Sequence, residues 1–405
     1  MTIEDSIRKL KDSITKIVSE FLTNAPKEVV LLHHNDTDGL STGTILFKAF
    51  ERESYKVHRF ALEKPYPEIV AKIFSGELIS DNGLIVFADF GSGMIETIKE
   101  INQNRFRVLI LDHHAISGSE SSSVRIINPL QFGIREAHCS ASALSFIFSL
   151  ALNSWNIDLA ALGALGALGD GFLIDGDLQG VNQLAAMEAR KQGEISSTGF
   201  IYLYGGNFDY KELCKAVDCL GSIAYFKGGS DIAIKALSEK SFDALTILAK
   251  PYLEEMSARF KFVMETQTLN ESLNINWFDL KDSFNEYGVK TVGLLCQKFR
   301  DSTRFTDQDT SKYIAGFQHV SSIIPGVGEL KEKISKVSMR VPSFLVTQIE
   351  NGTRPGLTEI LPQATRKVGG FVDACHRLAA ATTIPIGREE DLIVEMEKII
   401  ASYKK

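Results

Sequence analysis

Between residues 28 and 195, short apolar runs alternate with longer stretches of helical periodicity. Four of the apolar runs predict strands, at 28–32, 57–60, 84–88 and 108–111. The patterns between them predict helices over 41–53, 67–74 and 94–102. The runs at 84–88 and 108–111 are apolar throughout, which is typical of strands buried on both faces. This alternation predicts an α/β fold with a mostly parallel sheet and helices on both faces.

Apolar residues at helical spacing also predict an amphipathic helix at the N-terminus, over residues 3–22. It could dock a partner, but we expect it to pack against its own domain. Ser140 can act as the N-cap of a further helix that continues through Leu152. Another helix, rich in alanine and glycine, is expected over 159–168.

The pattern changes after residue 210. The stretch 211–275 is predicted to be helical, and we interpret it as a connector between domains. Beyond it, apolar segments at 275–280, 313–318, 336–340 and 345–349 predict strands separated by turns. We therefore expect an α/β domain over 1–210, the helical connector over 211–275, and a smaller mixed α/β domain over 276–405.

Length and composition are those of a two-domain globular protein, with 405 residues, 44% hydrophobic and 23% charged. No apolar run approaches the roughly 18 residues of a membrane span, so no membrane partner is expected. The five cysteines lack metal-ligand spacing and predict reduced thiols in a cytoplasmic protein. The net charge of −7 argues against a surface that binds nucleic acid throughout, although local basic grooves are compatible with it.

Acidic and histidine side chains follow the first predicted strand. If that strand continues, the alternation of side chains places His34, Asp36 and Asp38 on one side. His33 would then face the other way, as a packing residue. Gly39 permits the backbone to turn sharply directly after them.

Acidic and histidine residues also follow the later predicted elements. Asp89 follows the run 84–88, Asp112-His113-His114 follows 108–111, and Asp170 follows the helix over 159–168. Strand ends at this edge of an open α/β sheet are where such folds bind ligands, so we expect the groups to converge. One Asp at a strand end is more often a helix N-cap, and one buried His is usually only hydrogen-bonded. The joint pattern favours a metal site.

The expected donors are carboxylate oxygens and imidazole nitrogens, with no thiolate among them. Such a set suits Mn²⁺, Mg²⁺ or Co²⁺ better than a structural zinc. Two such ions about 3.5–4 Å apart would clamp a phosphoester for hydrolysis. The sequence therefore predicts a site for two-metal phosphoester hydrolysis.

In order and spacing, these segments resemble the four motifs of the DHH phosphoesterases. The matching residues are His34-x-Asp36-x-Asp38-Gly39, Asp89, Asp112-His113-His114 and Asp170. The stretch from Ile127-Asn128-Pro129 through Ser140 also looks like the family's segment between its third and fourth motifs. The resemblance covers residues 28–190.

This resemblance implies roles for the individual residues. The implied metal ligands are His34, Asp36, Asp38, Asp89, His113 and Asp170. Asp89 is the expected bridge between the two ions. Asp112 would orient the neighbouring metal-binding histidine, as such ligands generally require. His114 would contact the scissile phosphate or protonate the leaving oxygen.

The second domain resembles the DHH-associated C-terminal domain. Ser338-Met339-Arg340 is similar to its Ser-x-Arg strand, and Gly369-Gly370 and His376 are similar to its glycine-rich loop and following histidine. The resemblance implies that Arg340, Gly369, Gly370 and His376 bind substrate. A guanidinium matches phosphate geometry, and glycine amides can approach an anion closely.

This second match is partial. Asp373-Ala374-Cys375 stand where the family usually has glycines, and Ala381 replaces another glycine. A purely structural role for Gly369, Gly370 and His376 therefore stays open. Arg354 could be a second phosphate contact, but an exposed turn residue is the simpler interpretation.

The domain pairing is shared by several kinds of DHH protein, and the motifs look most like archaeal RecJ-like proteins. The leading hypothesis is a metal-dependent phosphodiesterase, a RecJ-like exonuclease that removes nucleotides from an end of single-stranded DNA or RNA. One alternative is a phosphoesterase for small substrates: very short oligonucleotides, cyclic dinucleotides or 3′-phosphoadenosine phosphate. Another is an inactive scaffold that binds replication or repair proteins.

Overall fold

In the computed structural model, residues 2–23, 26–302 and 311–403 are described. The chain divides into two compact units. Unit 1 comprises Met1–Gly221, Gly228–Tyr252 and Pro325–Val327. Unit 2 comprises Ser222–Lys227, Leu253–Ile324 and Gly328–Lys405.

Unit 1 is built on a five-stranded parallel sheet with the order β2-β1-β3-β4-β5. The strands are β1 (Glu28–His34), β2 (Lys56–Leu62), β3 (Leu84–Ala88), β4 (Arg107–Leu111) and β5 (Val124–Ile127). Every residue of β3 is buried, as expected for a strand covered on both faces. The predicted α/β fold is confirmed; the edge strand β5 is one that the apolar pattern did not indicate.

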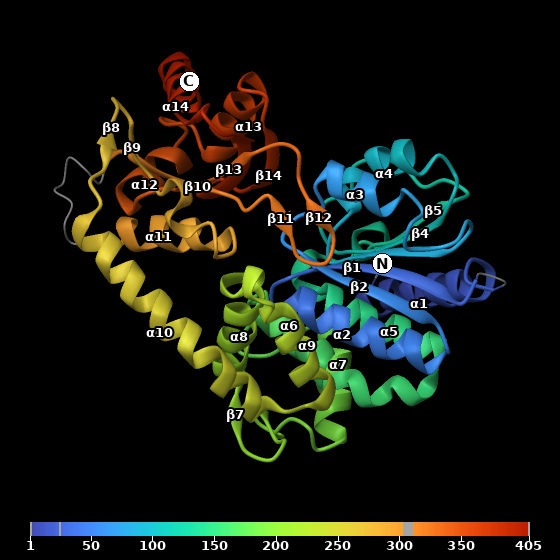
Figure 1. Ribbon diagram of the computed structural model, residues 1–405. Helices are drawn as coiled ribbons and strands as arrows, with labels where there is room; N and C mark the ends of the chain where they lie inside the picture. The colour runs from blue at the N-terminus through green and yellow to red at the C-terminus, as the bar shows by residue number, and fades with distance from the viewer. Residues whose placement is uncertain (1, 24–25, 303–310, 404–405) are drawn as a thin grey trace. The chain divides into compact units, whose positions relative to one another are not determined.

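Helices cover both faces of this sheet. Figure 1 shows α3 and α4 on one face and α1, α2 and α5 on the other. Their bounds are α1 (Ile3–Glu20), α2 (Thr37–Arg52), α3 (Pro67–Ile73), α4 (Ile95–Asn102), α5 (Ala141–Leu152), α6 (Ala160–Gly169) and α7 (Gly180–Lys191). The amphipathic α1 contacts α5 and α7, so it packs on its own domain as expected.

The region between 210 and 270 is helical, as its pattern predicts. It contains α8 (Tyr210–Asp218), a π-helical turn (Cys219–Ile223), α9 (Gly229–Glu239) and α10 (Phe242–Thr266). Contacts assign α8, α9 and the first part of α10 to unit 1, so the structure divides inside α10. The short strands β6 (Ile201–Tyr202) and β7 (Phe208–Asp209) precede α8.

Unit 2 contains a six-stranded mixed sheet with the order β14-β15-β13-β10-β9-β8. These strands are β8 (Asn270–Glu271), β9 (Ile275–Asp279), β10 (Tyr313–His319), β13 (Ile334–Arg340), β14 (Phe371–Cys375) and β15 (Ala379–Pro385). Only β9 and β10 pair in parallel. A separate hairpin joins β11 (Ile323–Ile324) to β12 (Gly328–Glu329).

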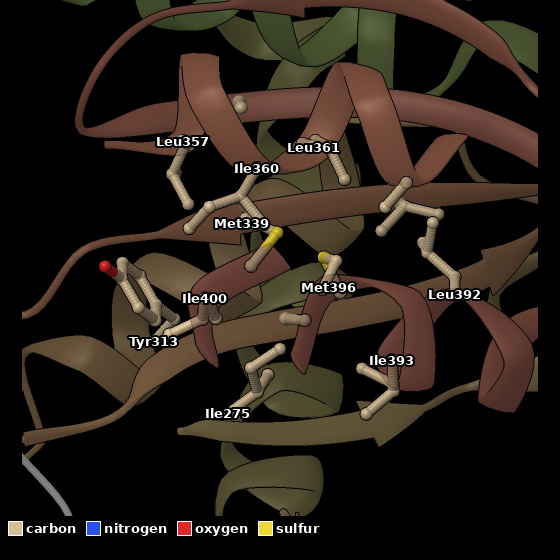
Figure 2. Packing of buried hydrophobic residues seen from close by; sticks show 14 of the residues in the cluster. Ile275, Tyr313, Met339, Leu357, Ile360, Leu361, Leu392, Ile393, Met396 and Ile400 are labelled. Atoms are coloured by element: carbon tan, nitrogen blue, oxygen red, sulfur yellow. The ribbon is translucent and has the colours of Figure 1, made fainter. Parts of the chain in front are cut away.

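Besides the second part of α10, unit 2 contains α11 (Lys290–Arg300), α12 (Ser343–Glu350), α13 (Leu357–Lys367) and α14 (Glu389–Ser402). Figure 2 shows side chains of α13 and α14 meeting Ile275, Tyr313 and Met339 of the sheet. The helix α11 contacts β13 and β10, where its packing depends on Gly316. A Cβ atom there would lie 2.7 Å from Cys296 Sγ of α11.

One predicted strand is wrong. The segment 345–349 forms part of the helix α12, where Leu345 and Ile349 are the buried residues. Their spacing of four residues places both on one helical face, and this spacing outweighs the β-branched residues between them. The five cysteines are free thiols, as expected. No helix in the described part of the chain is long and apolar enough to cross a membrane.

Candidate metal centre

The end of β1 and the loop directly after it supply the first two candidate ligands, His34 and Asp36. Nδ1 of His34 lies 2.9 Å from Oδ2 of Asp36. Asp36 is also the N-cap of α2, because its Oδ1 accepts a hydrogen bond from the amide of Gly39 at 3.1 Å. A Cβ atom on Gly39 would lie 2.4 Å from the carbonyl group of His34, so this turn requires glycine. Asp36 is therefore both the N-cap of α2 and a member of the metal cluster.

Asp38 reaches the site from the first turn of α2, not from a continued strand. The strand ends at His34, and helical geometry replaces the expected alternation of side chains. Asp38 is fully buried, and its two oxygens accept hydrogen bonds from the amides of Ala141 and Ser142, at 2.8 and 2.9 Å. These amides belong to the first turn of α5, whose positive end stabilises the carboxylate.

Asp89 lies between the two histidines. Its Oδ2 lies 3.7 Å from Nδ1 of His34, and its Oδ1 lies 3.3 Å from Nε2 of His113. Its backbone has a φ of 65°, an uncommon conformation for a residue other than glycine. The two oxygens of this one buried carboxylate thus face opposite halves of the cluster.

His113 and Asp170 complete the second half. Nε2 of His113 lies 3.6 Å from Oδ2 of Asp170 and 4.0 Å from Oδ2 of Asp38. Asp170 is the C-cap of α6. Within the described residues, neither ring nitrogen of the buried His113 makes a hydrogen bond. An imidazole with an unbonded nitrogen directed at carboxylates is suited to metal coordination.

All six predicted ligands are therefore brought together. Among the described residues, potential ligand atoms lie within 4.8 Å of one another in three groups. Two contain only predicted ligands: one of His34, Asp36 and Asp89 and one of Asp38, His113 and Asp170. The third consists of Asp89, Asp112, His113 and His114. Burial, with the negative charges of Asp38 and Asp36, raises the pKa of Asp89 well above its ordinary value. Divalent cations would offset this repulsion, so the donor set fits hard or borderline ions.

Asp112 contacts His114 rather than orienting the ring of His113, which corrects the role predicted for it. Its Oδ1 accepts hydrogen bonds from the amides of His113 and His114 and lies 2.8 Å from Nδ1 of the His114 ring. Its Oδ2 accepts from the amide of Ser92 at 2.9 Å. Burial opposes the charge, but these hydrogen bonds hold the pKa of Asp112 well below its ordinary value.

His114 is the accessible member of the tripeptide, with a side chain that is 53% exposed. Burial opposes its protonation, yet the hydrogen bond with Asp112 outweighs burial and raises the pKa of the His114 ring. The side chain of Asn128 donates to the carbonyl of His114 at 2.9 Å and to Ser92 Oγ at 3.0 Å. The ring is thus fixed at Nδ1, which leaves Nε2 for a substrate.

In unit 2, the half-buried Arg340 ends β13 on the side that contacts α11. Its Nη1 donates to Ser338 Oγ at 3.1 Å and to the carbonyl of Met339 at 2.8 Å. No carboxylate pairs with Arg340 in the part of unit 2 that the structure describes. A desolvated guanidinium without an acidic partner is suited to an anionic ligand.

His376 lies at the same end of the sheet as Arg340. Arg340 pairs with Ala379 in the sheet, and the amide of His376 donates to the carbonyl of Ala379 at 2.9 Å. The side chains of Asp373 and Ala374, the departures from the family pattern, lie outside the described residues. Arg354 lies in the bend that follows α12, is half-buried rather than exposed, and donates to Oδ1 of Asn274 at 2.6 Å.

Gly369 and Gly370 have a different role from the predicted phosphate loop. The amide of Gly369 donates to the carbonyl of Arg366, and that of Gly370 to the carbonyl of Thr365, at 3.3 and 2.9 Å. With Gly369 at a φ of 77°, these bonds form a Schellman motif that ends α13. Both amides are therefore already bonded, and they lie at the negative end of a helix.

Sequence reasoning did not identify the groups that support the loop after β1. Thr37 and Asn35, both buried, are hydrogen-bonded to Asp218 and to the carbonyl of Gly221. These partners are more than 180 positions away, so no local pattern indicates them.

Residues 28–167 match the model of the DHH family, N-terminal domain. A curated relative, an uncharacterized protein of Methanocaldococcus jannaschii, is 27% identical over 267 residues. That match covers 64% of this chain and 53% of the relative, so it spans about half of the relative's length.

Solved structures share the fold over both units. The DHH domain of a member of the s1p family of ribosomal proteins has a TM-score of 0.62 at 16% identity, covering 100% of this chain and 92% of that one. RecJ of Thermus thermophilus in complex with Mn²⁺ has a TM-score of 0.62 at 13% identity, covering 98% and 55%. CDC45 of Entamoeba histolytica has a TM-score of 0.52 at 11% identity, covering 99% of each chain.

Proposed function

We propose that this chain, whose residues 28–167 match the N-terminal domain of the DHH family, is a metal-dependent phosphodiesterase that removes nucleotides from an end of single-stranded DNA or RNA. The observation that supports it most is the position of Asp89, whose two oxygens face His34 and His113. A carboxylate between two donor groups is what a pair of ions requires. The DHH match and the RecJ-like fold support a hydrolase of phosphoester bonds.

We assign one ion to the group around His34 and the other to the group around His113, with Asp89 shared. Mn²⁺ is the proposed ion, and Mg²⁺ and Co²⁺ are compatible with the same donors. When bound, the ions would supply Lewis-acid activation of the phosphoester and of the attacking water.

The residues of the chain would bind and orient the substrate. Asp112 holds the ring of His114 through Nδ1, which leaves Nε2 to contact the phosphate and to give a proton to the leaving oxygen. In unit 2 we assign Arg340 and His376 to the terminal phosphate. Gly369 and Gly370 stay outside this assignment because α13 uses their amides.

The test is hydrolysis of single-stranded oligonucleotides labelled at the 5′ or the 3′ end, with Mn²⁺ present. Wild type should release mononucleotides from one end, and Asp89→Asn should lose activity by a factor of about 10³ or more, because both ions lose a shared ligand. The matched control is Asp81→Asn, an exposed aspartate of unit 1 that pairs with Arg105. Equal activity of wild type and Asp89→Asn would contradict the proposal.

A phosphoesterase for small substrates is the second candidate. It is favoured by the two phosphate-binding candidates that we assign in unit 2, Arg340 and His376, which would match a single phosphate, and by the net charge of −7. Comparing kcat/KM on dinucleotides and on 20-residue oligonucleotides separates the two. A preference for dinucleotides of tenfold or more would replace the leading proposal.

An inactive scaffold is the third possibility, suggested by the likeness to the fold of CDC45. The complete set of six donors argues against it, because burying several carboxylates beside one another destabilises a protein that binds no cation. Failure of wild type to bind Mn²⁺ in calorimetry would revive the scaffold.

A further inference from the structure

Thr37 lies between two candidate ligands, Asp36 and Asp38, and is 1% exposed. Its side chain also contacts the helix that ends at a third ligand. A Cβ atom on Gly169 would lie 2.5 Å from Thr37 Cβ, and Gly169 directly precedes Asp170. A shift of Thr37 would therefore displace ligands on both α2 and α6.

Asp218, at the end of α8, binds Thr37 twice. The backbone amide and the hydroxyl of Thr37 both donate to Oδ1 of Asp218, each at 2.9 Å. The hydroxyl also lies 3.1 Å from the carbonyl of Cys214, so its proton is shared between two acceptors. Thr37 is the first residue of α2, where the helix itself offers no partner for the amide. Asp218 supplies that partner.

The turn that follows α8 holds the neighbouring residue. Nδ2 of Asn35 donates to the carbonyl of Gly221 at 2.8 Å, within the π-helical turn Cys219–Ile223. A Cβ atom on Gly221 would lie 1.9 Å from the carbonyl oxygen of Asn35, so the approach requires glycine. Such turns are rare and are frequent at functional sites. Two successive contacts therefore fix the backbone on both sides of Asp36.

We infer that Asp218 is a positioning residue of the metal centre and acts through Thr37, an inference that rests on the proposed function. Its carboxylate fixes the first turn of α2, so Asp36 and Asp38 keep their spacing from Asp170. Metal ligands depend on such supporting hydrogen bonds for their affinity. A residue with only a structural role would change the stability of α8 and leave metal affinity unaltered.

The full chain is titrated with Mn²⁺ by isothermal calorimetry, and its Tm is measured without metal. Asp218→Ala should weaken Mn²⁺ binding by about 10–100-fold. Asp218→Asn should recover most of the affinity, since its amide oxygen can accept both bonds from Thr37. Thr37→Val removes the hydroxyl and keeps the backbone amide, so it should give a smaller loss of Mn²⁺ affinity. This variant also tests the inference if Asp218→Ala does not fold.

The control is Asp209→Ala, which removes the N-cap of the same helix. Asp209 accepts a hydrogen bond from the amide of Lys211 at 2.8 Å, far along α8 from Thr37. It should lower Tm without changing Mn²⁺ affinity. If both Asp218→Ala and Thr37→Val bind Mn²⁺ with wild-type affinity, the inference is wrong. It is also wrong if Asp209→Ala loses as much Mn²⁺ affinity as Asp218→Ala does. Neither result would contradict the metal centre itself. Absence of Mn²⁺ binding by wild type overturns both.

Discussion

At the scale of single residues, Asp38 shows how the site binds a buried carboxylate through backbone amides. Two amides at the start of α5 bind its two oxygens, and the helix dipole adds to their effect. Gly166 of α6 leaves the space for this arrangement. A Cβ atom there would lie 2.2 Å from both Oδ1 of Asp38 and Oγ of Ser142.

Gly166→Ala should therefore weaken Mn²⁺ binding by about tenfold or more, because Asp38 must move. Alanine in a helix normally gains about 1 kcal/mol over glycine, but overpacking costs about 1–3 kcal/mol. The free energy of unfolding should thus fall. Gly163→Ala is the matched control on the same helix, where the nearest atoms lie at 3.1 Å. Calorimetry and urea unfolding measure both effects; equal Mn²⁺ affinity in the two variants would contradict this account.

The residue types of the site could be predicted from sequence, but their contacts could not. Apolar runs that end in Asp or His identify candidate ligands because parallel strands share one edge. Which histidine Asp112 contacts depends on side-chain torsions, and these place Nδ1 of His114, not that of His113, against it. Asp218 was missed because chain folding alone brings it to Thr37.

At the scale of elements, the end of α13 separates two roles for glycine. Gly369 and Gly370 resemble an anion-binding loop by sequence, yet the same dipeptide also favours a helix C-terminus. The hydrogen bonds to Arg366 and Thr365 show the second role. Sequence alone could not distinguish them, because both need a residue that tolerates positive φ.

This distinction predicts opposite results for two variants. Arg340→Gln should raise KM for a 5′-phosphorylated oligonucleotide by about 10–100-fold, the effect of losing a charge-assisted hydrogen bond. Gly369→Ala should leave KM unchanged and lower the free energy of unfolding by about 1–2 kcal/mol, because alanine disfavours a φ of 77°. Steady-state kinetics and urea unfolding measure these. A rise in KM for Gly369→Ala would restore the phosphate-loop interpretation.

Strands and helices differ in how well sequence predicts them here. Buried strands such as 84–88 are continuous apolar runs, and the structure has the same bounds. The segment 345–349 also contains apolar and β-branched residues, but it forms part of the helix α12. Its two buried residues pack into the core of unit 2 with α13 and α14. Tertiary packing, not local preference, decides such short segments.

At the scale of the whole molecule, the two units divide the chemistry. All six candidate ligands belong to unit 1, and Arg340 and His376 belong to unit 2. Metal binding should therefore stabilise unit 1 directly. When the free Mn²⁺ concentration is 100 times Kd, binding of one ion raises the free energy of unfolding by about 2.7 kcal/mol.

Hydrogen exchange followed by mass spectrometry tests this division. Mn²⁺ should slow exchange in peptides that cover 34–40, 88–93 and 112–115, because ions fix the loops that follow β1, β3 and β4. Peptides that cover 334–340 and 379–385 of unit 2 should exchange as before. Asp89→Asn has no carboxylate between His34 and His113, so Mn²⁺ should give little protection in the loops of unit 1. Equal protection of both units by Mn²⁺, or protection that survives in Asp89→Asn, would mean that the ion binds elsewhere.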